Sequence, residues 1–226
     1  MGIRKTVATS ASTKIAPKFA SGYIRTVLER AIDGFGPMKS ASTSANMKLV
    51  GNNGDVEKAI RSLIRTHTGL AGAQGFVTNL GGVASVAVAI PANVVGVTLV
   101  QCHLVAGIAH LRGYDLEDPR VRNAILACML GEDTVDDLIK QKKIPSSPMA
   151  LATSPVHDPE LDKRIAAEVT TELFGKVAGR RAATLVGRRI PLLGGGVGAA
   201  SDGSSTFQIG KYAADQLKDR RLPKKR

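Results

Sequence analysis

Glycines near the end of the chain are the first residues whose spacing could do chemistry. In LLGGGVGAASDG, residues 192–203, Gly194, Gly196 and Ala199 fit the G-x-G-x-x-G/A pattern of a dinucleotide-binding turn, whose backbone amides hold a pyrophosphate. That fold also needs a second strand with an acidic ribose ligand about 20 residues further on. Asp219 lies at nearly that distance, but the surrounding QLKDRRLPKKR has no strand character. Small residues that recur every four positions favour close helix packing instead.

The histidines and cysteines form no familiar catalytic or metal-binding pattern. His103 and His110 are seven residues apart, which on one helical face places them about 10 Å apart along the axis, too far to share a metal ion. We expect both to be buried polar residues of the core or of an interface. Cys102 and Cys128 lie in apolar segments, so we expect free buried thiols. G-x-S-x-G, H-E-x-x-H and P-loop patterns are absent, so the sequence favours a protein that is not an enzyme and predicts no cofactor and no metal.

Acidic residues surround the apolar segment 121–129 and allow two interpretations. They could gather a divalent cation, or they could cap helices and compensate helix dipoles. Their positions before and within first turns favour capping. The residues are Asp115, Glu117, Asp118, Glu132, Asp133, Asp136 and Asp137. A further acid, Asp202, lies in an apolar glycine-rich run and needs a partner, and we expect it to cap the last helix with Ser204 or Ser205.

Helical periodicity dominates the elements that must position these residues. The spacing predicts a first helix over 15–35, a Ser- and Asn-rich loop over 38–54, and a helix that begins at Asp55. Asp118-Pro119 and Asp158-Pro159 are strong helix starts, because Asp accepts the free amides of the first turn and Pro has no N–H to lose.

Two further helix boundaries follow from the same signals. Thr134 and Asp137 resemble a capping box at the start of a short helix. The helix after Asp158 is long, and we expect a break near Gly179 or Gly187.

An apolar segment lies at the centre of the chain. The 46 residues 66–111 contain no Asp, Glu, Lys or Arg. Their length permits two membrane-spanning helices with a break at Pro91, while their glycines and polar residues weaken either half as a span. A helical hairpin buried in a domain and a hairpin embedded in a membrane both remain open, since small residues allow close helix contact in either setting.

The charge of the chain favours an anionic partner. Lys and Arg number 31 against 19 Asp and Glu, which gives a net charge of +12. We expect an anionic lipid surface to be contacted by basic residues late in the chain. They are Arg180, Arg181, Arg188, Arg189, Arg220, Arg221, Lys224 and Lys225. Nucleic acid is a less favoured partner, because only Phe207 and Tyr212 lie nearby for stacking.

Three stretches of the sequence resemble conserved blocks of the EcsC protein family. They are GFVTNLGGVASVAVAIPANVVGV, HLVAGIAHLRGYDLEDPRVRNAILACMLGED and RRIPLLGGGVGAASDGSSTFQIGKYA. The resemblance spans about residues 60–215, and the G-Y-D-L-x-D-P-x-V-R run from Gly113 to Arg122 is its most specific part. It implies a bacterial protein, from a family named for a member encoded beside the subunits of an ABC transporter. No catalytic residue is implied, because the family's biochemical function is not established.

The sequence therefore predicts an all-α fold: one helical-bundle domain with a central apolar, glycine-rich hairpin. Residues 1–14 are expected to be a flexible N-terminus without a cleaved secretory signal, 15–217 the domain, and 218–226 a basic tail. We expect a non-enzymatic, membrane-associated accessory protein, cytoplasmic or peripheral on the inner face of the cell membrane, with a transporter or another membrane protein as a further partner. The alternative is a soluble scaffold or nucleic-acid-binding protein whose apolar hairpin is ordinary core.

Overall fold

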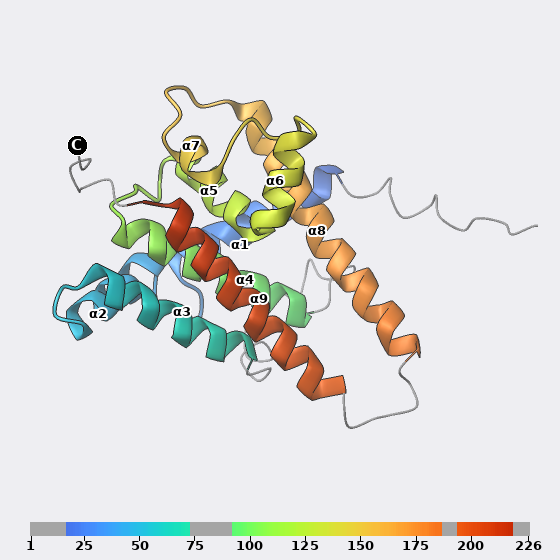
Figure 1. Cartoon of the computed structure of the whole chain (residues 1–226), viewed down its shortest axis with the longest axis horizontal. Helices are drawn as coiled ribbons and strands as arrows, with labels where there is room; N and C mark the ends of the chain where they lie inside the picture. Colours follow the sequence, from blue (N-terminus) through green and yellow to red (C-terminus); the bar gives the residue numbers. More distant parts are fainter. Residues whose placement is uncertain (1–16, 73–91, 187–193, 219–226) are drawn as a thin grey trace, which may run out of the picture.

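The computed structural model describes residues 17–72, 92–186 and 194–218, which form nine α-helices and no β-strand (Figure 1). The prediction of an all-α fold is confirmed for these residues. The helices are α1 (Pro17–Asp33), α2 (Ala41–Gly51), α3 (Val56–Gly72), α4 (Ala92–Leu111), α5 (Pro119–Leu130), α6 (Glu132–Lys140), α7 (Pro148–Ala152), α8 (Pro159–Val186) and α9 (Gly194–Gln216).

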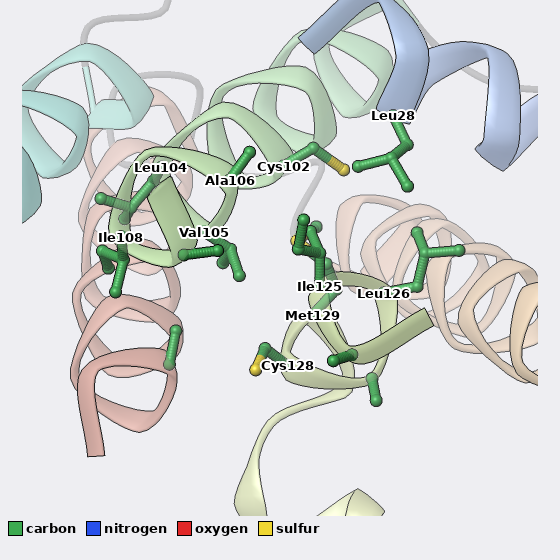
Figure 2. Packing of buried hydrophobic residues seen from close by; sticks show 14 of the residues in the cluster. Leu28, Cys102, Leu104, Val105, Ala106, Ile108, Ile125, Leu126, Cys128 and Met129 are labelled. Atoms are coloured by element: carbon green, nitrogen blue, oxygen red, sulfur yellow. The ribbon is translucent and has the colours of Figure 1, made fainter. Parts of the chain in front are cut away.

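The centre of the fold is α4. Its sequence is apolar on nearly every face, and the helix packs against α1, α2, α3, α5 and α9. A helix of this kind must be enclosed, either by protein or by lipid. Here protein encloses it: Cys102, Leu104 and Ile108 are fully buried, and Figure 2 shows Cys102 pointing toward Leu28 of α1. The second half of the apolar segment 66–111 is therefore core.

The rest of the predicted apolar hairpin is only partly described. Residues 73–91 lie outside the described residues, and the parts on either side are the end of α3 and the whole of α4, which pack against each other. None of the helices in the described ranges has both the length and the hydropathy of a membrane span.

Three of the predicted helix starts are confirmed. The carboxylate of Asp55 accepts a hydrogen bond from the N–H of Lys58 at 2.9 Å, at the N-terminus of α3. The carboxylate of Asp118 accepts a hydrogen bond from the backbone N–H of Arg120 at 2.8 Å, at the N-terminus of α5. Asp158 accepts one from the N–H of Glu160 at 2.9 Å, at the N-terminus of α8. The break in α8 was expected near Gly179 or Gly187. The first position is wrong, since α8 runs through Gly179; α8 ends at Val186, and Gly187 lies outside the described residues.

The loop predicted over 38–54 is wrong, because most of it forms α2. Ser40 caps this helix by accepting a hydrogen bond from the N–H of Thr43 at 3.2 Å. The polar residues misled the prediction because the helix buries only small side chains, Ala41 and Ala45, against α4. Tertiary packing, rather than local propensity, stabilises such a helix.

The capping box predicted at Thr134 and Asp137 is also wrong. Helix α6 begins two residues earlier, at Glu132, after Gly131, which provides no side-chain cap. The carboxylates of Glu132 and Asp133 in the first turn favour this start, because they interact with the positive end of the helix dipole.

The glycine segment that resembled a phosphate-binding turn begins α9, and tight packing of this helix is confirmed further along it. A Cβ on Gly203 would lie 3.5 Å from the carbonyl oxygen of Thr68 in α3. A Cβ on Gly210 would lie 2.9 Å from Cγ1 of Ile64 and 3.0 Å from Cδ2 of Leu104. The contact at Gly203 is an ordinary one that a small side chain could make, whereas at Gly210 only glycine lets α9 approach α3 and α4 this closely.

Candidate functional site

A buried pair of histidines joins α3 to α4. His103 is buried as predicted, and Nδ1 of its ring lies 2.8 Å from Nε2 of His67, which is also buried. The ring centroids are 5.0 Å apart and the ring planes differ by 24°. This centroid separation is close to the N···N distance plus the two ring radii, so the rings meet edge to edge. An N–H of one ring therefore points at a nitrogen of the other.

Each histidine also meets a backbone carbonyl at its second nitrogen. Nδ1 of His67 lies 2.8 Å from the carbonyl oxygen of Leu63, one turn earlier in α3. Nε2 of His103 lies 3.0 Å from the carbonyl oxygen of Lys39, just before α2. The contacts thus run from α3 through α4 to the start of α2.

Burial makes both rings reluctant to take a charge. It lowers the pKa of His67 to about 4, with further lowering by charge on His103 and Lys48. Burial also lowers the pKa of His103, while hydrogen bonds to the backbone at Lys39 and Ser40 raise it. Because charge on one ring opposes charge on the other, a second proton on the pair is disfavoured once the first is bound.

Three more polar contacts fix the α2–α3 hairpin. Nζ of Lys48 in α2 donates to Oγ1 of Thr66 in α3 at 2.9 Å. Nε2 of His110, in the last turn of α4, lies 3.0 Å from Oδ1 of Asn46 in α2. An ion pair joins Arg112, just after α4, to Glu57 at the start of α3. These contacts hold the two helices on each other and on the end of α4.

The prediction that His110 is buried is wrong. It is half-buried because it lies in the last turn of α4, where the helix reaches the surface. His110 lines two adjoining open hollows of about 340 and 480 Å³. Tyr114 and Asp115 line both hollows as well, so the two form one open depression with a mixed polar and apolar lining.

Both helices of the α2–α3 hairpin have exposed side chains on the side away from their buried residues, apolar in α2 and basic in α3, and we call these residues together its outer face. In α2, Met47 and Val50 have relative exposures of 55% and 78%, on the side opposite the buried alanines. In α3, Lys58, Arg61 and Arg65 are exposed at helical spacing, opposite the residues that pack on α4. The outer face is defined by these five residues.

The basic residues of the outer face are only partly neutralised. Lys58 pairs with Asp55 at the hairpin tip, with an Nζ–Oδ2 distance of 3.2 Å. Within the described ranges, Arg61 and Arg65 form no ion pair closer than 4.0 Å. Nζ of Lys39 lies 3.5 Å from Sδ of Met47, so a cation also borders the apolar side chains. Such a surface can bind anionic groups and small apolar areas together.

Most of the predicted basic contact residues lie outside the described residues. Arg180 and Arg181 belong to α8, although the placement of their side chains is not described. Residues 188–189 and 220–226 are not described. A contact of these residues with an anionic surface stays a prediction.

Asp202 is a buried polar residue, as its place in an apolar run predicts, but its expected role as a cap of the last helix is wrong. Asp202 lies inside α9, eight residues after its start, and its side chain is buried. The prediction failed because α9 begins within the glycines rather than after them. Glycine's low helix propensity concealed this start.

The acidic residues around α5 act within the fold. The carboxylate of Asp118 pairs with the guanidinium of Arg120 at 2.6 Å, and that of Glu117 pairs with Arg122 at 2.9 Å. The hydrogen bond from Arg120 lowers the pKa of Asp118. Among the residues that the structure describes, no three His, Cys, Asp or Glu side chains are grouped to hold a metal ion.

The two cysteines are free and fully buried, as predicted. Burial raises the pKa of Cys102 to about 12 and also raises that of Cys128. A thiol in this environment is a poor nucleophile, because the thiolate is the reactive form. Cys102 and His103 therefore do not form a nucleophile and base.

Comparison with family models assigns the chain. The model of the EcsC protein family matches residues 39–222. The chain belongs to the EcsC family. The match begins at Lys39, whose carbonyl meets His103, and it includes helices α2 to α9. The outer face and the histidine pair therefore both lie within the EcsC region. No curated protein and no solved structure was found to be similar to the chain.

Sequence analysis missed His67, although a signal was present. His67 follows Ile60, Leu63 and Ile64 at helical spacing, so it lies on the apolar face of its helix. A polar ring in that position requires a buried partner. The sequence could show the need for a partner, but not that the partner is His103, 36 residues away.

Proposed function

We propose that this EcsC-family protein is a non-enzymatic peripheral membrane protein that binds anionic lipid through the outer face of its α2–α3 hairpin. The observation that supports this proposal is the combination of two exposed apolar side chains with a row of cations. Met47 and Val50 are largely exposed, and among the described residues Arg61 and Arg65 form no ion pair within 4.0 Å, although Arg61 lies near enough to Asp55 to lower its pKa.

Both kinds of side chain gain free energy at a membrane surface. Each Lys or Arg near an anionic surface contributes on the order of 1 kcal/mol, and each fully buried Val or Met side chain about 1.5–3 kcal/mol. These magnitudes suit reversible adsorption, with the helices lying on the surface. A protein held in this way could act as an accessory to a membrane protein such as a transporter.

The charges of the fold favour one orientation on the membrane. Exposed acids gather on α6, where Glu132, Asp133, Asp136 and Asp137 lie, while the basic row lies on α3. Figure 1 shows α4 and α9 between α6, toward the top, and the α2–α3 hairpin at the lower left. An anionic surface would attract the hairpin and repel α6.

Flotation with vesicles tests the proposal. Wild-type protein is mixed with vesicles of phosphatidylcholine alone or with added phosphatidylglycerol, at low and high salt. We expect binding only to the anionic vesicles, and R61Q/R65Q should weaken it tenfold or more, on the order expected for two cations. The variant M47S/V50S should retain weak binding that high salt abolishes.

Matched controls separate the outer face from net charge. K140Q/K163Q removes the same two charges from exposed positions on α6 and α8 and should leave binding unchanged. A chain that ends at Leu217 tests the contribution of the basic tail. Equal binding by R61Q/R65Q and wild type would contradict the proposal, and absence of binding to any vesicle would favour the scaffold alternative.

A further inference from the structure

The histidine pair has three hydrogen-bonding contacts, and two neutral rings cannot satisfy all three. The contacts join Leu63 to His67, His67 to His103, and His103 to Lys39, at 2.8, 2.8 and 3.0 Å. The outer partners are carbonyl oxygens, which only accept. Each contact therefore needs its own ring N–H, so the two rings together need three protons. Two neutral imidazoles have two, and an imidazole with an imidazolium has three.

Removing one of the three protons would place two acceptors against each other. If both neutral rings donate outward to the carbonyls, the lone pairs of His67 Nε2 and His103 Nδ1 face each other at 2.8 Å. If one ring donates inward, its other nitrogen faces a carbonyl at 2.8 or 3.0 Å with no proton between them. Either arrangement is repulsive, so one contact must open.

The surroundings favour one added proton and oppose a second. Lys48 of α2 opposes charge on His67, as does charge on His103 itself. Cys102, next to His103 in α4, is a buried thiol whose pKa burial raises, so it stays neutral beside the pair. Asp202 of α9 is also buried, next to Gly203, which packs on Thr68 of α3. A proton on His103 completes all three contacts, whereas a second on His67 Nε2 would face the N–H of His103.

We propose that His67 and His103 bind one proton as a unit, and that this proton strengthens the attachment of the α2–α3 hairpin to α4. The carbonyl of Lys39 immediately precedes the Ser40 cap of α2, so the third contact fixes the start of the helix that bears Met47. Proton release opens one contact and loosens the outer face.

This regulation rests on the proposed lipid binding of the same outer face. A surface that is fixed in advance binds more tightly than one that must be ordered on binding. Completing one hydrogen bond corresponds to about a fivefold change in affinity. Because burial lowers the pKa of both rings below the usual 6.5, the proton is taken up at acidic pH, and we expect binding to anionic vesicles to strengthen by about that factor between pH 7.5 and pH 4.5.

Nitrogen-15 NMR of the imidazole rings tests the proton count directly, without lipid. The chain has four histidines, so spectra of H110Q and H157Q identify the signals of the pair by elimination. Between pH 8 and pH 4.5 we expect one proton to be taken up by the two rings together, with their signals changing at the same pH. Two independent titrations, or none before unfolding, would overturn the proposal.

Vesicle binding then tests the consequence. H67Q should bind vesicles with little dependence on pH. The control is H157Q, because His157 lies just before α8 and is not part of the pair, and this variant should keep the wild-type dependence. If H67Q does not fold, the NMR titration of the wild-type chain still decides the proton count. If wild-type protein binds vesicles equally at both pH values, the regulation is overturned and the proposed function is not. If it binds vesicles at neither pH, the proposed function is overturned, while the NMR result on the proton count stands.

Discussion

The carboxylate of Asp118 has two partners that can be separated by mutation. It accepts a hydrogen bond from the backbone N–H of Arg120 as the cap of α5, and it also pairs with the guanidinium of that residue. Asparagine retains the capping oxygen but not the charge, whereas alanine retains neither.

We predict that D118A lowers the free energy of unfolding by about 1 kcal/mol, the usual effect of losing a cap, and that D118N lowers it by less than half as much. Urea denaturation at pH 7 measures both.

Because the pKa of Asp118 is lowered in the fold, its ionic contribution is present at neutral pH and is lost as the pH falls below about 4. Equal losses in the two variants would show that the ion pair, and not the cap, stabilises this end of α5.

Residue-level prediction from the sequence succeeded where the signal was local. The caps at Asp118 and Asp158 are local, because donor and acceptor are two residues apart. The pairing of His67 with His103 and the burial of Asp202 depend on which helices meet, and no spacing within one segment contains that information.

Among the helices, α9 depends most clearly on a missing side chain. A Cβ on Gly210 would be too close to Ile64 and Leu104, and Ile64 is branched at Cβ, so its Cγ1 cannot easily move away. A Cβ on Gly175 in α8, by contrast, would meet no atom within 4 Å.

We predict that G210A destabilises the protein by about 1–3 kcal/mol, because overpacking outweighs the gain in helix propensity. G175A should stabilise it by about 0.5–1 kcal/mol, since only the propensity changes. Thermal unfolding of the two variants beside wild type gives the comparison. A higher melting temperature for both would mean that α9 moves away from α3 without cost.

At the level of elements, periodic segments were predicted well and short polar ones were not. Helices α1, α3 and α5 have apolar residues at regular helical spacing, and their positions agree with expectation. Helix α2 does not, because its buried positions are alanines and its polar residues resemble those of a loop. The outer face was missed for the same reason: two of its five residues, Met47 and Val50, belong to a helix that the sequence did not predict.

For the whole molecule, the separation of charge between α3 and α6 makes a prediction that net charge does not. D136N/D137N raises the net charge by two at exposed positions of α6. At physiological ionic strength charges are screened beyond about 8 Å, so we expect this variant to bind anionic vesicles within twofold of wild type. The measurement is flotation at about 0.15 M salt. A strong rise in affinity would show that binding follows net charge and not the outer face.

The packing of α9 also has a consequence for the order in which the chain can fold during synthesis. Helices α3 and α4 leave the ribosome long before α9, which covers Ile64 and Leu104 with Gly210 and its neighbours. Until residues 194–217 have emerged, that apolar groove is open to solvent and to chaperones. Translation of about 80 residues separates the end of α4 from the start of α9, which at 5–20 residues per second lasts roughly 4–16 seconds. The nascent chain therefore exposes this groove for much of its synthesis, and ribosome-bound chains that stop before α9 should be far more sensitive to protease than chains that include it.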